Sequence, residues 1–194
     1  MITGLLVDSF ARFLLYLDEP SQRRQAELAS LFARGEYRPF DTPALVSLAS
    51  LHLFVPKWEP LDGEVEAVFV EPGALHVVYR DEVFPLSKAV DASYRELRRE
   101  QYGRTMDIET VYVDESETGG TALFETTSAG INPYETNWHF TDRQPWSGAL
   151  YKTTWNGLMT TRPAAAITLR GGYRESGLTL YYGAREDAEA FARL

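Results

Sequence analysis

The residues best suited to chemistry gather in one stretch, 134–157, which reads YETNWHFTDRQPWSGALYKTTWNG. His139 lies three residues before Asp142, and an imidazole oriented by a carboxylate is the usual form of a general base. Glu135 is an alternative partner for the same imidazole. The sequence specifies no nucleophile, and it contains no G-x-S-x-G, H-E-x-x-H, P-loop or dinucleotide motif. A cofactor-free hydrolase or isomerase is therefore our third-ranked hypothesis, and we favour a non-enzymatic protein.

Aromatic side chains in the same stretch suggest a binding site. Side chains alternate along a strand, so Trp138 and Phe140 share one face, as do Tyr151 and Trp155. Tyr182 on a later strand extends this set. The aromatic face either fills a core, as cross-strand aromatic pairs commonly do, or lines a pocket for a small apolar or aromatic ligand. The pocket is our leading site hypothesis, and both interpretations stay open.

Trp146 differs from these residues because we predict that it lies in a loop, 142–148, with no strand partner. An exposed loop tryptophan suits a ligand lid, a sugar-stacking platform or a protein contact, or it folds back on the sheet. The chain has 28 acidic and 19 basic residues and a net charge of -9. An acidic surface with this loop predicts, as the second hypothesis, an inhibitor, an immunity-type protein or an assembly partner.

Composition excludes several classes of site. Cysteine is absent, which excludes disulfides, thiolate nucleophiles and Cys-based zinc sites. His76 faces Glu64 and Glu66 across a predicted hairpin, but exposed strands commonly carry such residues, and we predict no metal and no cofactor. The negative charge disfavours a nucleic-acid partner. We expect the arginines of residues 95–104 to form a solvated helix face.

The N-terminus carries Asp8 and Arg12 within its apolar stretch and has no basic leader, so we predict no signal peptide. No uncharged run approaches the ~18 residues of a membrane span. These patterns predict a cytoplasmic protein without a membrane partner.

The spacing of apolar residues predicts an α+β fold. Three N-terminal helices are expected over 5–17, 21–35 and 43–55, the third apolar nearly all round, and the first and third offer a homodimer face. Residues 64–70 and 74–79 predict a β-hairpin, and 88–102 a helix that ends at Gly103. Six strands follow, and the chain closes with a helix over 186–194. The six strands are expected over 108–113, 121–127, 136–141, 149–155, 164–170 and 178–182.

Short loops between these strands favour antiparallel pairing. The sequence therefore predicts a single domain, 1–194, in which a helical part, 1–56, packs on a mainly antiparallel part, 57–194. The six strands would form one curved sheet or open barrel. This coarse arrangement resembles lipocalin-like ligand-binding folds in architecture alone and carries no function with it.

Overall fold

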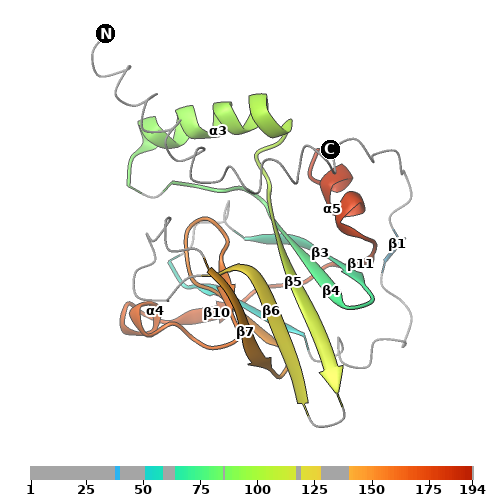
Figure 1. Cartoon of the computed structure of the whole chain (residues 1–194). Helices are drawn as coiled ribbons and strands as arrows, with labels where there is room; N and C mark the ends of the chain where they lie inside the picture. The colour runs from blue at the N-terminus through green and yellow to red at the C-terminus, as the bar shows by residue number, and fades with distance from the viewer. Residues whose placement is uncertain are drawn as a thin grey trace.

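The structure of the chain is a computed structural model that describes residues 38–39, 51–58, 64–84, 86–116, 119–127 and 140–193. This part of the chain is mostly sheet, with three short helices (Figure 1). The helices are α3 (Lys88–Tyr102), α4 (Ala165–Leu169) and α5 (Arg185–Phe191). The strands are β1 (Arg38–Pro39), β2 (His52–Pro56), β3 (Val65–Glu71), β4 (Ala74–Tyr79), β5 (Asp107–Ser116), β6 (Gly119–Thr127), β7 (Phe140–Trp146), β8 (Ala149–Lys152), β9 (Met159–Thr160), β10 (Tyr173–Glu175) and β11 (Leu180–Tyr182).

The larger sheet has seven strands in the order β1-β11-β3-β4-β5-β6-β7. Strands β3 to β7 form an antiparallel meander, whereas β11 runs parallel to β3. Gly73, with φ of 84°, allows the tight turn that joins β3 to β4. All six residues of β4 are buried, because this centre of the sheet is covered on both faces.

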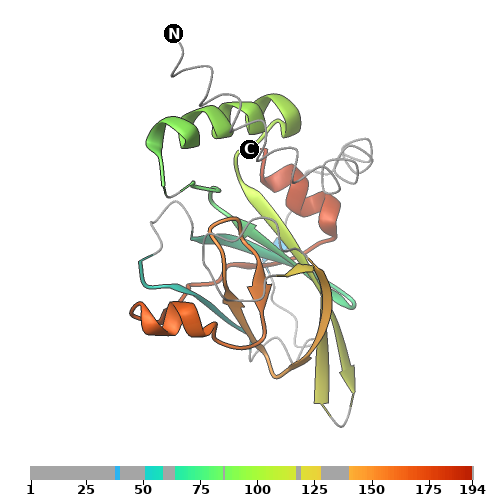
Figure 2. The same cartoon turned by 60° about the vertical axis from the view of Figure 1, so that its left-hand side comes forward.

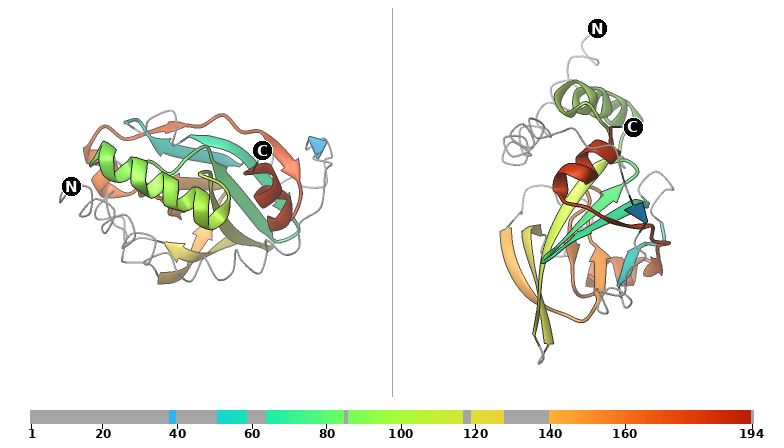
Figure 3. Two further views of the ribbon diagram at one scale, coloured as in Figure 1. Left: turned by 90° about the horizontal axis from the view of Figure 1, so that it is seen from above. Right: turned by 90° about the vertical axis from the view of Figure 1, so that its right-hand side faces the viewer.

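The smaller sheet has four strands in the order β10-β2-β8-β9, and β2 runs parallel to β8. Leu53, Val55 and Leu150 on its inner face join Val68 and Val77 of the larger sheet in the main core. A second cluster lies on the other face of the larger sheet, where Ala67, Phe69 and Val78 pack against Ala188 and Ala192 at the end of the chain. Figures 2 and 3 show α3 and α5 at one end of the molecule and α4 beside the smaller sheet.

Local signals account for α3. The Ser87 hydroxyl accepts a hydrogen bond from the Val90 amide, and Gly103, with φ of 70°, ends the helix in the left-handed conformation. This confirms the predicted helix over 88–102. The predicted hairpin over 64–79 and the C-terminal helix are also confirmed, as β3, β4 and α5.

The prediction of three N-terminal helices is wrong. The segment predicted as the third helix ends in strand β2, in which Leu53 and Val55 are buried, His52 is exposed and Phe54 is half-buried. This is the period of a strand, and a short apolar run does not distinguish the two structures by itself. The segments predicted as the first two helices lie outside the described residues.

The prediction of one curved antiparallel sheet or open barrel is also wrong. The described strands form two separate sheets, neither of them closed, and two of the strand pairs are parallel. The predicted strand over 164–170 is helix α4 instead. Three consecutive alanines, Ala164 to Ala166, favour helix there over the β-branched residues that follow. None of the helices in the described part of the chain combines the length and the apolar character that crossing a membrane requires.

Candidate functional site

The aromatic residues predicted to form one lining occupy different places. Trp138, like His139 and Glu135, lies outside the described residues, and Phe140 begins strand β7. Tyr151 lies on β8 and stacks against Phe54, Tyr182 lies on β11 in the other sheet, and Trp155 lies in the turn after β8. Among the described residues, Tyr151, Trp155 and Tyr182 therefore lie in three different places of the fold.

Trp146 does not lie in an exposed loop. It is the last residue of β7, pairs with Gly120, and is only 6% exposed within the main core. Pro145 is compatible with this strand because β7 is an end strand of the larger sheet among the described strands, and proline is tolerated on edge strands. Asp142, the predicted partner of His139, lies on the same strand and accepts a hydrogen bond from Gln144.

The structure instead gathers buried charges beneath α3. We call Glu82, Tyr94, Arg98 and Asp107 the junction cluster. Arg98 is 2% exposed, so the prediction of a solvated arginine face is wrong for this residue. Its position was readable from the sequence, because residue 98 lies four positions after Tyr94 and eight after Val90, on the buried side of the helix.

The guanidinium group of Arg98 has several partners. Its guanidinium forms an ion pair with Glu82, and its Nη2 donates to Asp107 Oδ1 at 3.1 Å. Tyr94 Oη donates to Glu82 Oε1 at 3.0 Å. The guanidinium carbon lies 5.7 Å from the ring centroid of Tyr94 and 5.3 Å from that of Tyr102. Removing this charge from water is costly, and the carboxylates fixed beside it offset that cost.

A second buried ion pair continues the cluster towards α5. Arg104 donates to both carboxylate oxygens of Glu189, at 2.9 and 3.1 Å, and Arg185 donates to Glu189 Oε1 at 2.8 Å. Burial alone would raise the pKa of Glu189, but the two guanidinium groups outweigh it and hold the pKa below its usual range. The Met106 carbonyl accepts from both Arg98 and Arg104, which connects the two groups.

The polar chain ends at a buried histidine. Arg185 donates to Thr110 Oγ1 at 3.0 Å, and Thr110 is hydrogen-bonded to His76 Nδ1 at 2.9 Å. His76 Nε2 lies 2.8 Å from Glu71 Oε1. Both ring nitrogens of His76 therefore have partners in the fold, and Glu66 pairs with Arg80 rather than with this histidine.

Mild acid is expected to destabilise the protein through His76. Burial is the main cause that lowers the pKa of His76, and the hydrogen bond to Glu71 opposes it only in part. As the pH falls, the His76 side chain therefore binds a proton in the unfolded chain before it does so in the folded protein. The contribution of His76 to stability is full above about pH 6.5 and is lost as the pH drops below that value. We expect the urea midpoint to fall between about pH 7 and about pH 5.5, and His76→Gln to flatten this dependence. The exposed His52, changed to Gln, is the matched control, and equal slopes in both variants would contradict the assignment.

The turn after β8 lies against the junction cluster. The Trp155 ring contacts Phe84 and Tyr94 edge-on, at centroid distances of 5.2 and 5.7 Å. Trp155 is 4% exposed, and its indole nitrogen has no hydrogen-bond partner in the described part of the chain. The side-chain oxygen of the next residue, Asn156, is buried and equally without a partner there. A buried N–H group without an acceptor is uncommon, because no hydrogen bond offsets the free-energy cost of removing the group from water.

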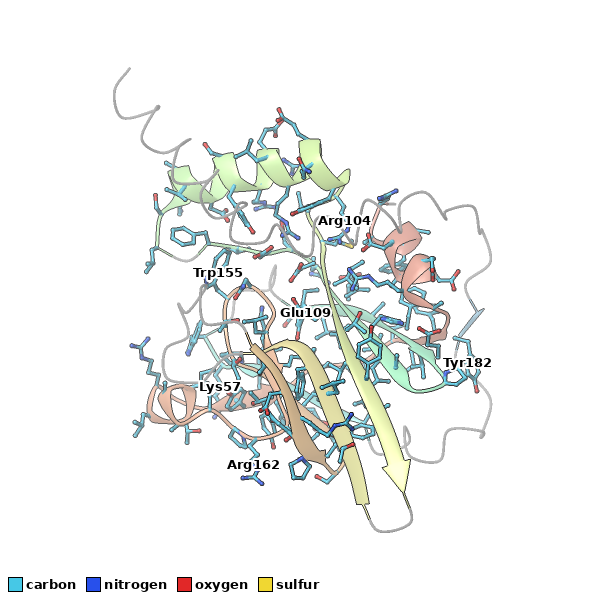
Figure 4. The ribbon with its side chains drawn as sticks, viewed as in Figure 1. Lys57, Arg104, Glu109, Trp155, Arg162 and Tyr182 are labelled. Atoms are coloured by element: carbon cyan, nitrogen blue, oxygen red, sulfur yellow. The ribbon has the colours of Figure 1, made fainter. Side chains whose placement is uncertain are left out.

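Charged side chains also lie close to this turn. A Cβ atom built on Gly157 would lie 2.7 Å from Asp107 Oδ2, 3.1 Å from Glu109 Cγ and 3.2 Å from Tyr79 Cε2. Lys152, which is fully buried, places its ammonium 4.7 Å from the centroid of the Tyr79 ring. Figure 4 shows Trp155 below α3, Arg104 in the segment between α3 and β5, and Glu109 on β5.

Phe84, Tyr94 and Trp155 thus form an aromatic layer, which adjoins a layer of buried charges through the hydrogen bond from Tyr94 to Glu82. We call the two layers together the junction site. Comparison with protein-family models, with curated proteins and with solved structures gives no match to this chain. Any inference about function must therefore rest on the residues themselves.

Proposed function

We propose that the protein is a non-enzymatic binding protein that holds a small aromatic molecule at the junction site. One observation carries this proposal: the buried indole N–H of Trp155 lacks an acceptor in the described part of the chain. A ligand with a carbonyl or other acceptor would satisfy that group, and its ring would meet the apolar faces of the aromatic layer. The unpartnered Asn156 oxygen favours a ligand that also carries a hydrogen-bond donor.

The fixed ion pairs support a binding role rather than catalysis. Arg98, Glu82 and Asp107 are committed to one another, so they stiffen the floor of the site. A preformed, rigid site loses less conformational entropy when it binds a ligand. The acid–base pair predicted from the sequence, His139 with Asp142 or Glu135, stays a prediction because His139 and Glu135 lie outside the described residues.

Native mass spectrometry of the gently purified protein tests the proposal. We expect the wild-type protein to retain an added mass that is lost on denaturation. Trp155→Phe keeps an aromatic ring but removes the hydrogen-bond donor. Because one hydrogen bond contributes ~1 kcal/mol, the affinity for the ligand should fall about fivefold. Trp146→Phe is the matched control, since the Trp146 indole nitrogen is also buried without a partner in the described residues but lies in the main core.

The outcomes separate clearly. Loss of the added mass in Trp155→Phe with retention in Trp146→Phe supports the site. Retention of the same mass in both variants would place the ligand elsewhere, and a bare wild-type protein would count against small-molecule binding. The indole N–H resonance of Trp155 should move when the ligand is removed, whereas that of Trp146 should not.

A further inference from the structure

The outer face of the smaller sheet carries a row of aromatic side chains, Phe54, Tyr151 and Tyr173, which we call the outer row. These residues alternate with inward-facing residues such as Leu53 and Leu150, and all three are half-buried. The rings of Phe54 and Tyr151 stack at 4.7 Å with an angle of 11°, and Tyr173 contacts Tyr151 at 5.1 Å and 76°. None of them belongs to the main core or to the junction site.

The stacking decides what such a surface can bind. Side chains stand roughly perpendicular to a sheet, so the parallel rings of Phe54 and Tyr151 turn their faces to each other and their edges outward. Ring edges carry positive partial charge and ring faces negative charge. Sugars and nucleic-acid bases need free ring faces for stacking, whereas carboxylates and apolar side chains are accommodated by edges. The outer row therefore favours an acidic, partly apolar ligand.

Exposed basic and apolar side chains surround Tyr173. The Lys57 amide donates to the Gly172 carbonyl at 3.0 Å, and the Ala164 amide, two residues after Arg162, donates to Tyr173 Oη at 3.1 Å. Lys57 and Arg162 are both exposed, and Figure 4 shows them on the side of the molecule that carries α4 and β10. Of the nearby acidic groups, Glu64 forms an ion pair with Arg174, and the exposed Glu175 is hydrogen-bonded to His52. At this corner of the molecule the basic groups among the described residues, Lys57, Arg162 and Arg174, thus outnumber the acidic ones.

Large apolar side chains are exposed at the same corner. In the described part of the chain three such residues are exposed, namely Trp58, Leu86 and Leu169. Trp58 follows Lys57, and Leu169, which is 88% exposed, ends α4 three residues before Gly172. Two of the three therefore flank the segment that enters β10. Exposed apolar groups beside basic groups are typical of a protein-binding surface.

Strand β10 offers backbone groups to an incoming chain. It is the end strand of the smaller sheet among the described strands. Gly172 and Ser176 bond to β2, so the alternation of an antiparallel ladder directs the backbone groups of Tyr173 and Glu175 away from β2. An extended peptide can add to such an edge as a further strand.

We infer that the outer row and β10 bind an extended acidic segment of a partner protein. The segment adds to β10 through backbone hydrogen bonds. Its carboxylates face Lys57, Arg162 and the aromatic edges, and its apolar side chains contact Leu169. This interaction is separate from ligand binding at the junction site and does not depend on it.

Fluorescence anisotropy with a labelled peptide of alternating glutamate and valine tests the inference on the full chain. We expect saturable binding that weakens as salt is added, because exposed charges are screened. Lys57→Glu combined with Arg162→Glu should weaken binding by about tenfold, and Leu169→Ser should weaken it as well. The matched controls are Lys88→Glu and Leu86→Ser, which make changes of the same kind at exposed positions in α3 and just before it and should leave binding unchanged.

Changes to the probe test the mode of binding. Two peptides of the same sequence can be N-methylated, each on one of the two alternate sets of amides. One of the two should no longer bind, because its methyl groups remove the hydrogen bonds that pair the peptide with β10. Equal binding of a lysine–valine peptide, or equal losses in the control variants, would overturn the inference. Oligothymidylate that binds more tightly than the peptide, and loses that binding when residues of the outer row are replaced, would overturn the inference in favour of a single-stranded nucleic acid.

Discussion

Replacing Arg98 by methionine is expected to lower the free energy of unfolding by about 3–5 kcal/mol. Arg98 is 2% exposed, and its partners Glu82 and Asp107 are 4% and 8% exposed. Methionine fills a similar volume but leaves two buried carboxylates without their cation. The remaining charges then carry the desolvation penalty that the ion pairs had offset.

Chemical denaturation of the variant, followed by circular dichroism, measures this change. Arg99→Met is the matched control on the same helix, because Arg99 is 53% exposed and forms an ion pair with the exposed Glu96, so its loss should stay within about 0.5 kcal/mol. Adding Glu82→Gln and Asp107→Asn to Arg98→Met should restore part of the stability, since the stranded charges are removed. A loss below about 1 kcal/mol in Arg98→Met would show that water reaches this cluster.

Local signals in the sequence predicted single elements well. The helix over 88–102 has its N-cap at Ser87, its left-handed end at Gly103 and a regular apolar spacing between them. The hairpin of β3 and β4 was predicted from two β-rich runs around Pro72 and Gly73. In both cases the information lies within about fifteen residues, the range over which turn chemistry and periodicity act.

The assembly of the two sheets could not be predicted in the same way. The smaller sheet depends on the parallel pairing of His52 with Ala149, and the larger one on the pairing of Leu180 with Val68. These contacts join residues that are far apart in the sequence and separated by several other elements. No local pattern in either strand specifies such a partner, so the sequence favoured the simpler meander of neighbouring strands.

The junction site was missed for a related reason. We predicted Arg98 on the solvated face of the helix, although its spacing from Tyr94 places it on the buried side, because an arginine is buried only when counter-charges reach it. Those charges, Glu82 and Asp107, come from a connecting segment and from β5. Trp155 was predicted as a ligand-binding residue on the basis of a strand face that ends at Lys152 in the structure. The surroundings of its N–H group depend on the conformation of the turn after β8, which the sequence did not predict.

Gly157→Ala is expected to destabilise the protein by about 2–4 kcal/mol, through two separate costs. The first is backbone strain, because Gly157 has φ of +85° and an alanine there costs about 1–2 kcal/mol. The second is a collision with Asp107 Oδ2, only 2.7 Å from the new Cβ. A free carboxylate would swing aside, but this one is held by Arg98.

Gly103→Ala separates the two costs. Gly103 has φ of +70°, and no atom of the described residues lies within 4 Å of an added Cβ, so that variant carries the strain alone. Chemical denaturation of both variants should therefore show a larger loss for Gly157→Ala, and the difference measures the collision. Because Trp155 lies in the same turn, Gly157→Ala should also alter the near-ultraviolet circular dichroism of the tryptophans, whereas Gly103→Ala should not. Equal losses in the two variants would mean that Asp107 can leave Arg98 at little cost, in which case the floor of the junction site is not rigid and the preorganised binding proposed for it would lose its physical basis.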